Sequence, residues 1–122
     1  MLEIKKKIMV VDDDALLQEL LVLTMEMQGY QVTAASNGKQ AMDLARTEQF
    51  DMILLDMMMP VLDGIRFLQF KSTFKSPDVP VLVLTAVHDQ AKISQVKLAG
   101  ASEVLCKPVD TQTLLQTVAL FI

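Results

Sequence analysis

The sequence predicts a doubly wound α/β fold, in which a five-stranded parallel sheet carries helices on both faces. With 122 residues, of which 52% are hydrophobic and 21% charged, the chain has the size and composition of one globular domain. Short apolar runs, typical of strands buried on both faces, alternate with longer segments whose apolar residues recur at helical spacing. Right-handed crossovers between parallel strands then place helices on both sides of the sheet.

The first half of the chain opens with an apolar run at 8–11, which predicts the first strand. Asp14 is in position to cap the helix that follows, and Gly29 ends that helix. A second strand is expected at 30–34. The Asn37–Gly38 turn then begins a second helix, which reaches about residue 48.

The middle of the chain is an unbroken apolar run at 52–55 that ends in the carboxylate of Asp56. A run of this length predicts the central strand, buried on both faces. Asp63–Gly64 begins a third helix, and the proline-containing segment 76–80 ends it. The inward side chains of this helix are expected to be Ile65, Phe67, Leu68 and Phe70.

The last third repeats the pattern twice. A fourth strand at 81–84 leads into a helix at 89–98, in which Ile93 and Val96 face inward and which Gly100 ends. A fifth strand at 103–106 precedes a final helix at 111–122, for which either the aspartate at position 110 or the threonine at 111 is the cap.

Polar residues follow the strands of the predicted sheet. For five strands the flavodoxin-like (βα)5 order 2-1-3-4-5 is suitable, and its ligand crevice lies between the first and third strands. Asp12 and Asp13 follow the first strand and Asp56 ends the third. Thr85 and Lys107 end the fourth and fifth strands at the same edge. We therefore expect these five side chains to converge.

Such a cluster points to phosphoryl chemistry with a divalent cation. Neighbouring carboxylates repel one another and raise a pKa unless a cation lies between them. Mg²⁺ is suitable, because it binds one or two carboxylates, keeps several waters and shares phosphate oxygens. A carboxylate is also a known covalent nucleophile toward phosphoryl groups. A phosphoryl group on Asp56 would be neutralised by Mg²⁺ and the Lys107 ammonium, with the Thr85 hydroxyl donating to an oxygen.

Four segments, in order and over essentially the whole chain, resemble the receiver domain of two-component response regulators. They are Val10–Asp14, Leu54–Gly64, Leu84–Ala86 and Lys107–Pro108. The resemblance implies a phosphoacceptor domain. In it, Asp56 would take a phosphoryl group from a histidine kinase or a histidine phosphotransfer protein and switch the surfaces offered to an output domain or protein.

The resemblance also implies the ligands of the metal ion. Asp13 would bind Mg²⁺ directly and Asp12 largely through water. Asp56 and the backbone carbonyl of Met58 would be the other protein ligands. Met58 is also apolar at a position that influences phosphoryl lifetime in the family.

Thr85 and Lys107 would contact the phosphoryl oxygens, and the peptide bond between Lys107 and Pro108 would be cis, as X–Pro bonds can be. Two positions depart from the family. Val104 stands three residues before the lysine, where the family often has an aromatic residue coupled to the threonine. Val87, two residues after the threonine, is apolar, so neither it nor Met58 can orient an attacking water. We expect slow self-hydrolysis.

Three other functions remain as alternatives. A phosphorylation-independent interaction module would keep the fold, although it has no need of every site residue. A Mg²⁺-dependent phosphatase of the haloacid-dehalogenase type usually has a second aspartate where this chain has Met58. A flavin-binding protein would have a Gly- or Ser/Thr-rich loop after the first strand. We therefore do not expect a turnover enzyme.

The first helix carries two apolar stripes, and its function is open. One stripe is enough to cover a sheet. The second either packs under neighbouring elements or forms a docking surface for a kinase or phosphotransfer bundle. The stripes consist of Leu17, Leu21 and Met25, and of Leu16, Leu20, Leu23 and Met27.

Composition limits the partners and the location. The net charge of −4 argues against nucleic-acid binding by this domain. No apolar stretch is long enough to span a membrane, and the first residues do not resemble a signal peptide. A cytoplasmic protein with its single cysteine, Cys106, unpaired is expected. We expect residues 1–122 to be one receiver domain, cut from a longer protein or standing alone, with a homodimer through the last helices as an option.

Overall fold

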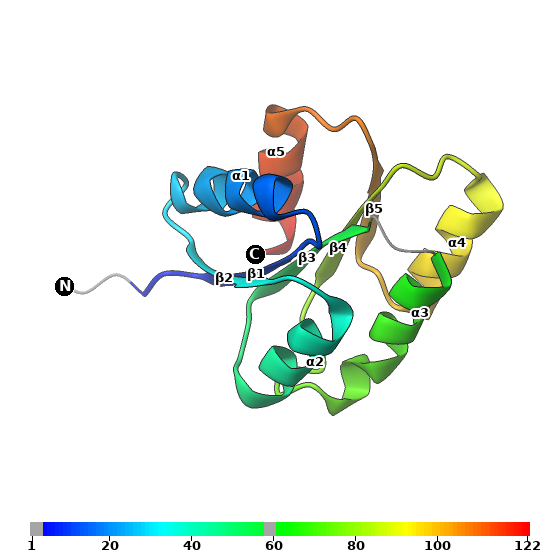
Figure 1. The fold of residues 1–122 in the computed structure, drawn as a ribbon, viewed down its shortest axis with the longest axis horizontal. Helices are drawn as coiled ribbons and strands as arrows, with labels where there is room; N and C mark the ends of the chain where they lie inside the picture. The colour runs from blue at the N-terminus through cyan, green and yellow to red at the C-terminus, as the bar shows by residue number, and fades with distance from the viewer. Residues whose placement is uncertain (1–3, 58–60) are drawn as a thin grey trace.

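The computed structural model describes residues 4–57 and 61–122, which form an α/β domain around a parallel sheet (Figure 1). The strand order is β2-β1-β3-β4-β5, and every neighbouring pair is parallel. The predicted doubly wound fold and its 2-1-3-4-5 order are therefore confirmed. The strands are β1 (Lys7–Val11), β2 (Gln31–Ala35), β3 (Met52–Met57), β4 (Val81–Thr85) and β5 (Glu103–Cys106).

Helices cover both faces of the sheet. In Figure 1, α1 and α5 lie on one side, and α2, α3 and α4 lie on the other. A short 3₁₀ helix, η1 (Phe70–Thr73), continues α3. The helices are α1 (Ala15–Glu26), α2 (Gly38–Thr47), α3 (Val61–Gln69), α4 (Gln90–Ala99) and α5 (Thr111–Phe121). Among the described residues, no helix combines the length and apolarity that crossing a membrane requires.

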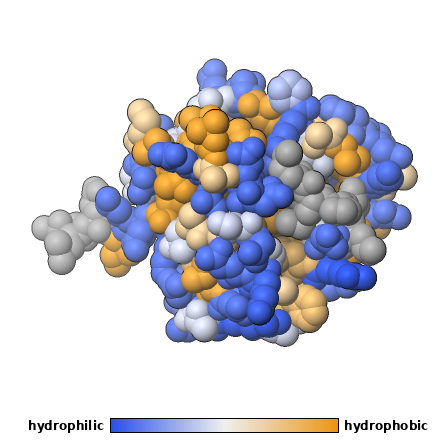
Figure 2. Space-filling model, viewed as in Figure 1, coloured by the Kyte–Doolittle hydropathy of each residue, from blue (hydrophilic) through white to orange (hydrophobic). Residues whose placement is uncertain are grey.

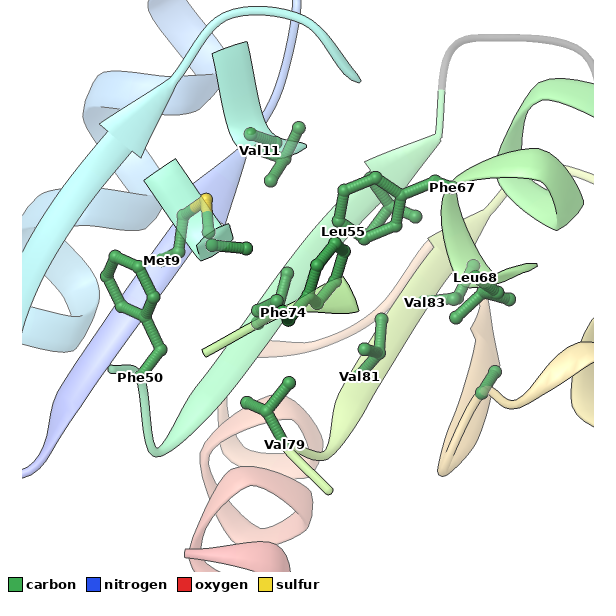
Figure 3. Close-up of a cluster of buried hydrophobic side chains, with 14 of the residues drawn as sticks. Met9, Val11, Phe50, Leu55, Phe67, Leu68, Phe74, Val79, Val81 and Val83 are labelled. Carbon is green, nitrogen blue, oxygen red and sulfur yellow. The ribbon is translucent and has the colours of Figure 1, made fainter. Parts of the chain in front are cut away.

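Alternate residues of the strands divide the core into two clusters. The larger cluster lies under α2, α3 and α4, where Phe67 and Phe74 pack with their ring centroids 5.4 Å apart (Figure 3). Its strand residues include Met9, Val11, Ile53, Leu55, Val81 and Val83. The smaller cluster lies under α1 and α5 and includes Ile8, Val10, Met52, Leu54, Leu82 and Leu84 from the strands. This period of two, buried on both faces, explains the unbroken apolar runs.

Side-chain caps begin most of the helices at the predicted residues. The Asp14 carboxylate accepts hydrogen bonds from the backbone N–H groups of Leu16 and Leu17. Asp110, one of two candidates for the last helix, accepts from the Thr113 N–H at 2.8 Å. Gly100 ends α4 with a φ of 128°, a backbone conformation that favours glycine.

The third helix differs from the prediction in two respects. It begins at Val61, two residues before the predicted Asp63, and it ends at Gln69, well before the proline-containing segment. Phe70 was expected to face inward but is 44% exposed, because it begins the 3₁₀ turn and leaves the helix's inner face. The Arg46 guanidinium lies 5.6 Å from the centre of its ring.

Candidate functional site

Two buried carboxylates lie side by side where β1 and β3 end. Val10 pairs with Leu54 and Val11 with Leu55, so the same register places Asp12 level with Asp56. The alternation of the strands also puts both side chains on the α1 and α5 face of the sheet. Asp12 is 1% exposed and Asp56 is 4% exposed. Carboxylates are rarely buried to this degree, so the pair marks a site that needs a partner for its charge.

Asp12 is only half satisfied by the protein. Its Oδ1 accepts a hydrogen bond from the Asp14 N–H at 2.9 Å, whereas its Oδ2 has no hydrogen-bond partner among the described residues. Burial, and to a smaller extent the neighbouring Asp56 charge, raise the pKa of the Asp12 carboxyl to about 6 against the opposing effect of the Asp14 N–H. Lys107 has a smaller, lowering effect. A group in this state attracts a cation or a proton.

Lys107 supplies positive charge to this pair from the end of β5. Its Nζ forms an ion pair with Asp56 Oδ1, which accepts no hydrogen bond beyond that contact within the described part of the chain. The Lys107 N–H donates to the Thr85 carbonyl at 2.7 Å, and the Lys107–Pro108 peptide bond is cis, as predicted. The ammonium therefore reaches the central strand across the end of β4.

Thr85 is the last residue of β4 and is 4% exposed. Its Oγ1 accepts a hydrogen bond from the Val87 N–H at 3.1 Å, which leaves the hydroxyl proton to donate elsewhere. The thiol of Cys106, opposite Thr85 in the ladder, donates to the Val87 carbonyl at 3.4 Å. The start of the loop after β4 is thus tied to β5.

One predicted metal ligand, Asp13, does not join this cluster. Asp13 is exposed and lines a separate groove of about 390 Å³ with Asn37, Lys39 and Phe67 among others. Accordingly, residues 4–57 and 61–122 contain no group of three or more His, Cys, Asp or Glu side chains arranged to hold a metal ion. Met58, whose carbonyl was predicted as a ligand, lies outside the described residues.

Comparison with known proteins identifies the family and the fold of this chain. The family model described as "Response regulator receiver domain" matches residues 8–119. The chain belongs to the response regulator receiver family. Its structure is also closely similar to those of solved receiver domains. The chemotaxis response regulator CheY4 of Vibrio cholerae superposes with a TM-score of 0.86 at 30% identity, covering 98% of this chain and all of that chain.

Other relatives add context for this receiver domain. It is 40% identical over 114 residues to the probable transcriptional regulator ycf27 of Guillardia theta, covering 93% of this chain and 44% of that protein. It is 39% identical over 110 residues to the response regulator MprA of Mycolicibacterium vanbaalenii, covering 89% of this chain and 47% of that protein. The chain thus spans less than half the length of these curated relatives.

A further structural relative is the receiver domain of the sensor histidine kinase PA1611 from Pseudomonas aeruginosa, which was crystallised with a magnesium ion in its active-site cleft. It superposes on this receiver domain with a TM-score of 0.84 at 28% identity, covering 97% of this chain and 98% of that chain.

The residues of this receiver domain fit a hard divalent cation. The observation that supports this fit is the buried Asp12 Oδ2, a carboxylate oxygen to which no described group donates a hydrogen bond. It lies next to a second buried carboxylate, that of Asp56. Oxygen donors of this kind are the ligands that Mg²⁺ prefers. Asp13 follows Asp12 directly in the chain, so its carboxylate is the nearest additional donor in sequence.

An apolar groove beside the site was not predicted as such. It has a volume of about 480 Å³ and contains Asp56 and Lys107 at its polar end. Its apolar wall comes from α1, β4, α5 and the segment before α5, through Leu17, Leu20, Leu21, Leu84, Pro108, Val109 and Leu114. The sequence signal for it was the pair of apolar stripes on the first helix, because Leu17 and Leu21 come from one stripe and Leu20 from the other.

Proposed function

We propose that this receiver domain accepts a phosphoryl group on the Asp56 carboxylate in a reaction that requires Mg²⁺. The single observation that supports this most strongly is the buried ion pair of Asp56 and Lys107 beside the unsatisfied oxygen of Asp12. This arrangement holds a nucleophilic carboxylate, a fixed positive charge and a vacant oxygen ligand at the crevice of the sheet.

In the proposed step, one oxygen of the Asp56 carboxylate attacks the phosphorus of a phosphohistidine. The new O–P bond forms as the P–N bond breaks, and the bonding electron pair stays on the departing imidazole nitrogen. Lys107 neutralises negative charge on the transferred oxygens, and Thr85 donates its hydroxyl proton as a hydrogen bond to one of them. Each residue is held by the main chain of a different strand end, so the site needs little rearrangement.

Mg²⁺ would be held by Asp12, Asp13 and Asp56, with the Met58 carbonyl as a further candidate. Bound there, it would supply positive charge to the phosphoryl oxygens and to the crowded carboxylates. The protein's own contribution is to keep Asp12 buried and aimed at the crevice through the Asp14 N–H.

The donor is proposed to be a histidine kinase or a histidine phosphotransfer protein that docks on α1. The stripe left open by the sequence lies at the surface: Leu16 is 75% exposed, Leu20 59%, Leu23 51% and Met27 83%. Figure 2 shows apolar side chains gathered over this region. Because Leu20 of this stripe lines the same groove as Asp56, a helix seated on the stripe would bring its histidine toward the carboxylate.

Phosphorylation would shift a pre-existing equilibrium between two surface states and so change the affinity for an output domain or protein. The domain would promote its own phosphorylation and dephosphorylation without being a turnover enzyme. We place this activity in the cytoplasm, where such kinases present their phosphohistidine.

The test is the intact mass of the protein after incubation with acetyl phosphate and Mg²⁺. One phosphoryl adduct is expected on the wild type, and none on an Asp56→Asn variant or in EDTA. If the folded wild type gains no adduct, the phosphorylation-independent interaction module becomes the better description.

A further inference from the structure

The side chain of Gln18 joins three segments behind the acidic loop. Gln18 lies near the start of α1 and is half-buried. Its Nε2 lies 3.1 Å from the Asp12 carbonyl oxygen, 2.9 Å from the Ala35 carbonyl oxygen and 3.3 Å from the Ser36 hydroxyl. One amide group thus contacts the ends of β1 and β2 and the loop after β2.

The acceptors determine how this amide is oriented. Carbonyl oxygens can only accept hydrogen bonds, so the amide nitrogen, with its two protons, must face Asp12 and Ala35. A Gln18 oxygen turned toward them would repel both. The Asp12 N–H also donates to the Ala35 carbonyl, at 3.0 Å. The carbonyl of Ala35 therefore receives one hydrogen bond from Asp12 and another from Gln18.

These contacts fix Asp12 from both sides of its Cα atom. Its N–H is held by Ala35, its carbonyl by Gln18, and its carboxylate by the N–H of Asp14. The carbonyl of Asp12 belongs to the peptide unit that leads to Asp13. Gln18 therefore restrains the main chain between the two acidic residues without touching either carboxylate.

We propose that Gln18 is a positioning residue for the Mg²⁺ site, and this inference rests on the proposed function. Groups that orient metal ligands from behind typically change metal affinity 10- to 100-fold when they are removed. Loss of the amide frees the Asp12 carbonyl to rotate and spreads Asp12 and Asp13 over more orientations. Fewer of these present both carboxylates to one ion, so Mg²⁺ binds more weakly.

A purely structural role for Gln18 makes a different prediction. If the amide only attaches α1 to the sheet, its loss lowers the stability of the metal-free protein and leaves the affinity for Mg²⁺ unchanged. Thermal unfolding over a series of Mg²⁺ concentrations measures both quantities. The metal-free Tm reports the attachment, and the Mg²⁺ concentration at which Tm begins to rise reports the affinity.

The decisive variant is Gln18→Met, which keeps the length and apolar stem of the side chain and removes the donors. We expect its Kd for Mg²⁺ to be about tenfold higher than that of the wild type. Gln116→Met makes the same change on an exposed position of α5 and should leave the Kd unchanged. Ser36→Ala removes only the 3.3 Å contact and should also leave it unchanged.

An unchanged Kd in Gln18→Met would overturn the inference. If that variant does not fold, Gln18→Asn serves instead, because its amide is one methylene too short to reach both carbonyls and the same weakening is expected. A wild type that binds no Mg²⁺ would overturn the proposed function and this inference together. A wild type that binds Mg²⁺ and a Gln18→Met variant that binds it equally well would overturn the inference alone.

Discussion

Replacing Asp12 with asparagine should stabilise the metal-free domain while weakening its response to Mg²⁺. Burial and the Asp56 charge raise the pKa of Asp12 from 3.8 to about 6, so ionising this group costs more in the folded than in the unfolded state. A group whose folded pKa is raised contributes stability that is complete below the unfolded pKa and is lost as the pH rises through the folded pKa. The free energy of unfolding of the wild type should therefore fall as the pH rises from about 4 to about 6 and beyond.

The size of the effect follows from the shift. Each pKa unit corresponds to about 1.4 kcal/mol, so a shift of about two units makes the ionised group cost on the order of 3 kcal/mol at pH 7.5. Asp12→Asn removes that charge and keeps an oxygen that can accept from the Asp14 N–H. In EDTA at pH 7.5 we expect the variant to be more stable than the wild type by about 1 to 3 kcal/mol. At pH 4 the gain should largely disappear.

Urea unfolding in EDTA at both pH values measures this difference. A matched control is Asp43→Asn, an exposed aspartate on α2, for which a change within about 0.5 kcal/mol is expected. Added Mg²⁺ should then stabilise the wild type more than Asp12→Asn. The difference in stability between the two proteins should therefore be smaller in Mg²⁺ than in EDTA. The reasoning is refuted if Asp12→Asn is no more stable than the wild type in EDTA at pH 7.5.

Three further predictions concern phosphorylation. Lys107→Met removes the ammonium beside Asp56. Because a single positioned donor of this kind contributes about 10²- to 10³-fold to rate, adduct formation from acetyl phosphate should slow by that factor. An unchanged rate would contradict the role of Lys107. Leu20→Glu should impair transfer from a protein phosphodonor while leaving acetyl phosphate labelling and Tm nearly unchanged, and loss of both activities would contradict docking on α1. The phosphorylated wild type should lose its phosphoryl group slowly, as followed by intact mass, and a half-life of seconds would contradict the interpretation of the apolar Val87.

The architecture could be predicted from the sequence because strands that are buried on both faces of a sheet consist of consecutive apolar residues. The first four residues of β3, 52–55, form a continuous apolar run. The caps Asp14 and Asp110 act through their own backbone neighbours, so local sequence was enough to predict them. The meeting of Asp12 and Asp56 followed from strand order alone. The inward orientation of Phe70 was wrong, because the end of α3 depends on where the 3₁₀ turn begins, which helical spacing does not encode.

The finer structure of the site depends on contacts between segments far apart in the sequence. Gln18 is polar on a mostly apolar helix and would pass for a solvated residue, yet it reaches the end of β2, 17 residues away. The difference in burial between Asp12 and Asp13 depends on which of two adjacent side chains follows the sheet's alternation and which turns outward. No pattern in the sequence predicts the contacts of Gln18 or the different burial of Asp12 and Asp13.

The hydrogen bonds around Thr85 suggest a route by which the proposed phosphorylation would act on the rest of the domain. Val104 is buried at 8% exposure in the core cluster under α2, α3 and α4, so no aromatic ring at that position is available to follow the threonine. Instead, Thr85 is joined to Val87 by a hydrogen bond, Val87 to Cys106 by another, and the Thr85 carbonyl to the Lys107 N–H. A shift of Thr85 toward a phosphoryl oxygen would therefore pull on the loop before α4 and on the end of β5 together. We expect the change to be transmitted through the backbone of these two segments rather than through the rotamer of one side chain.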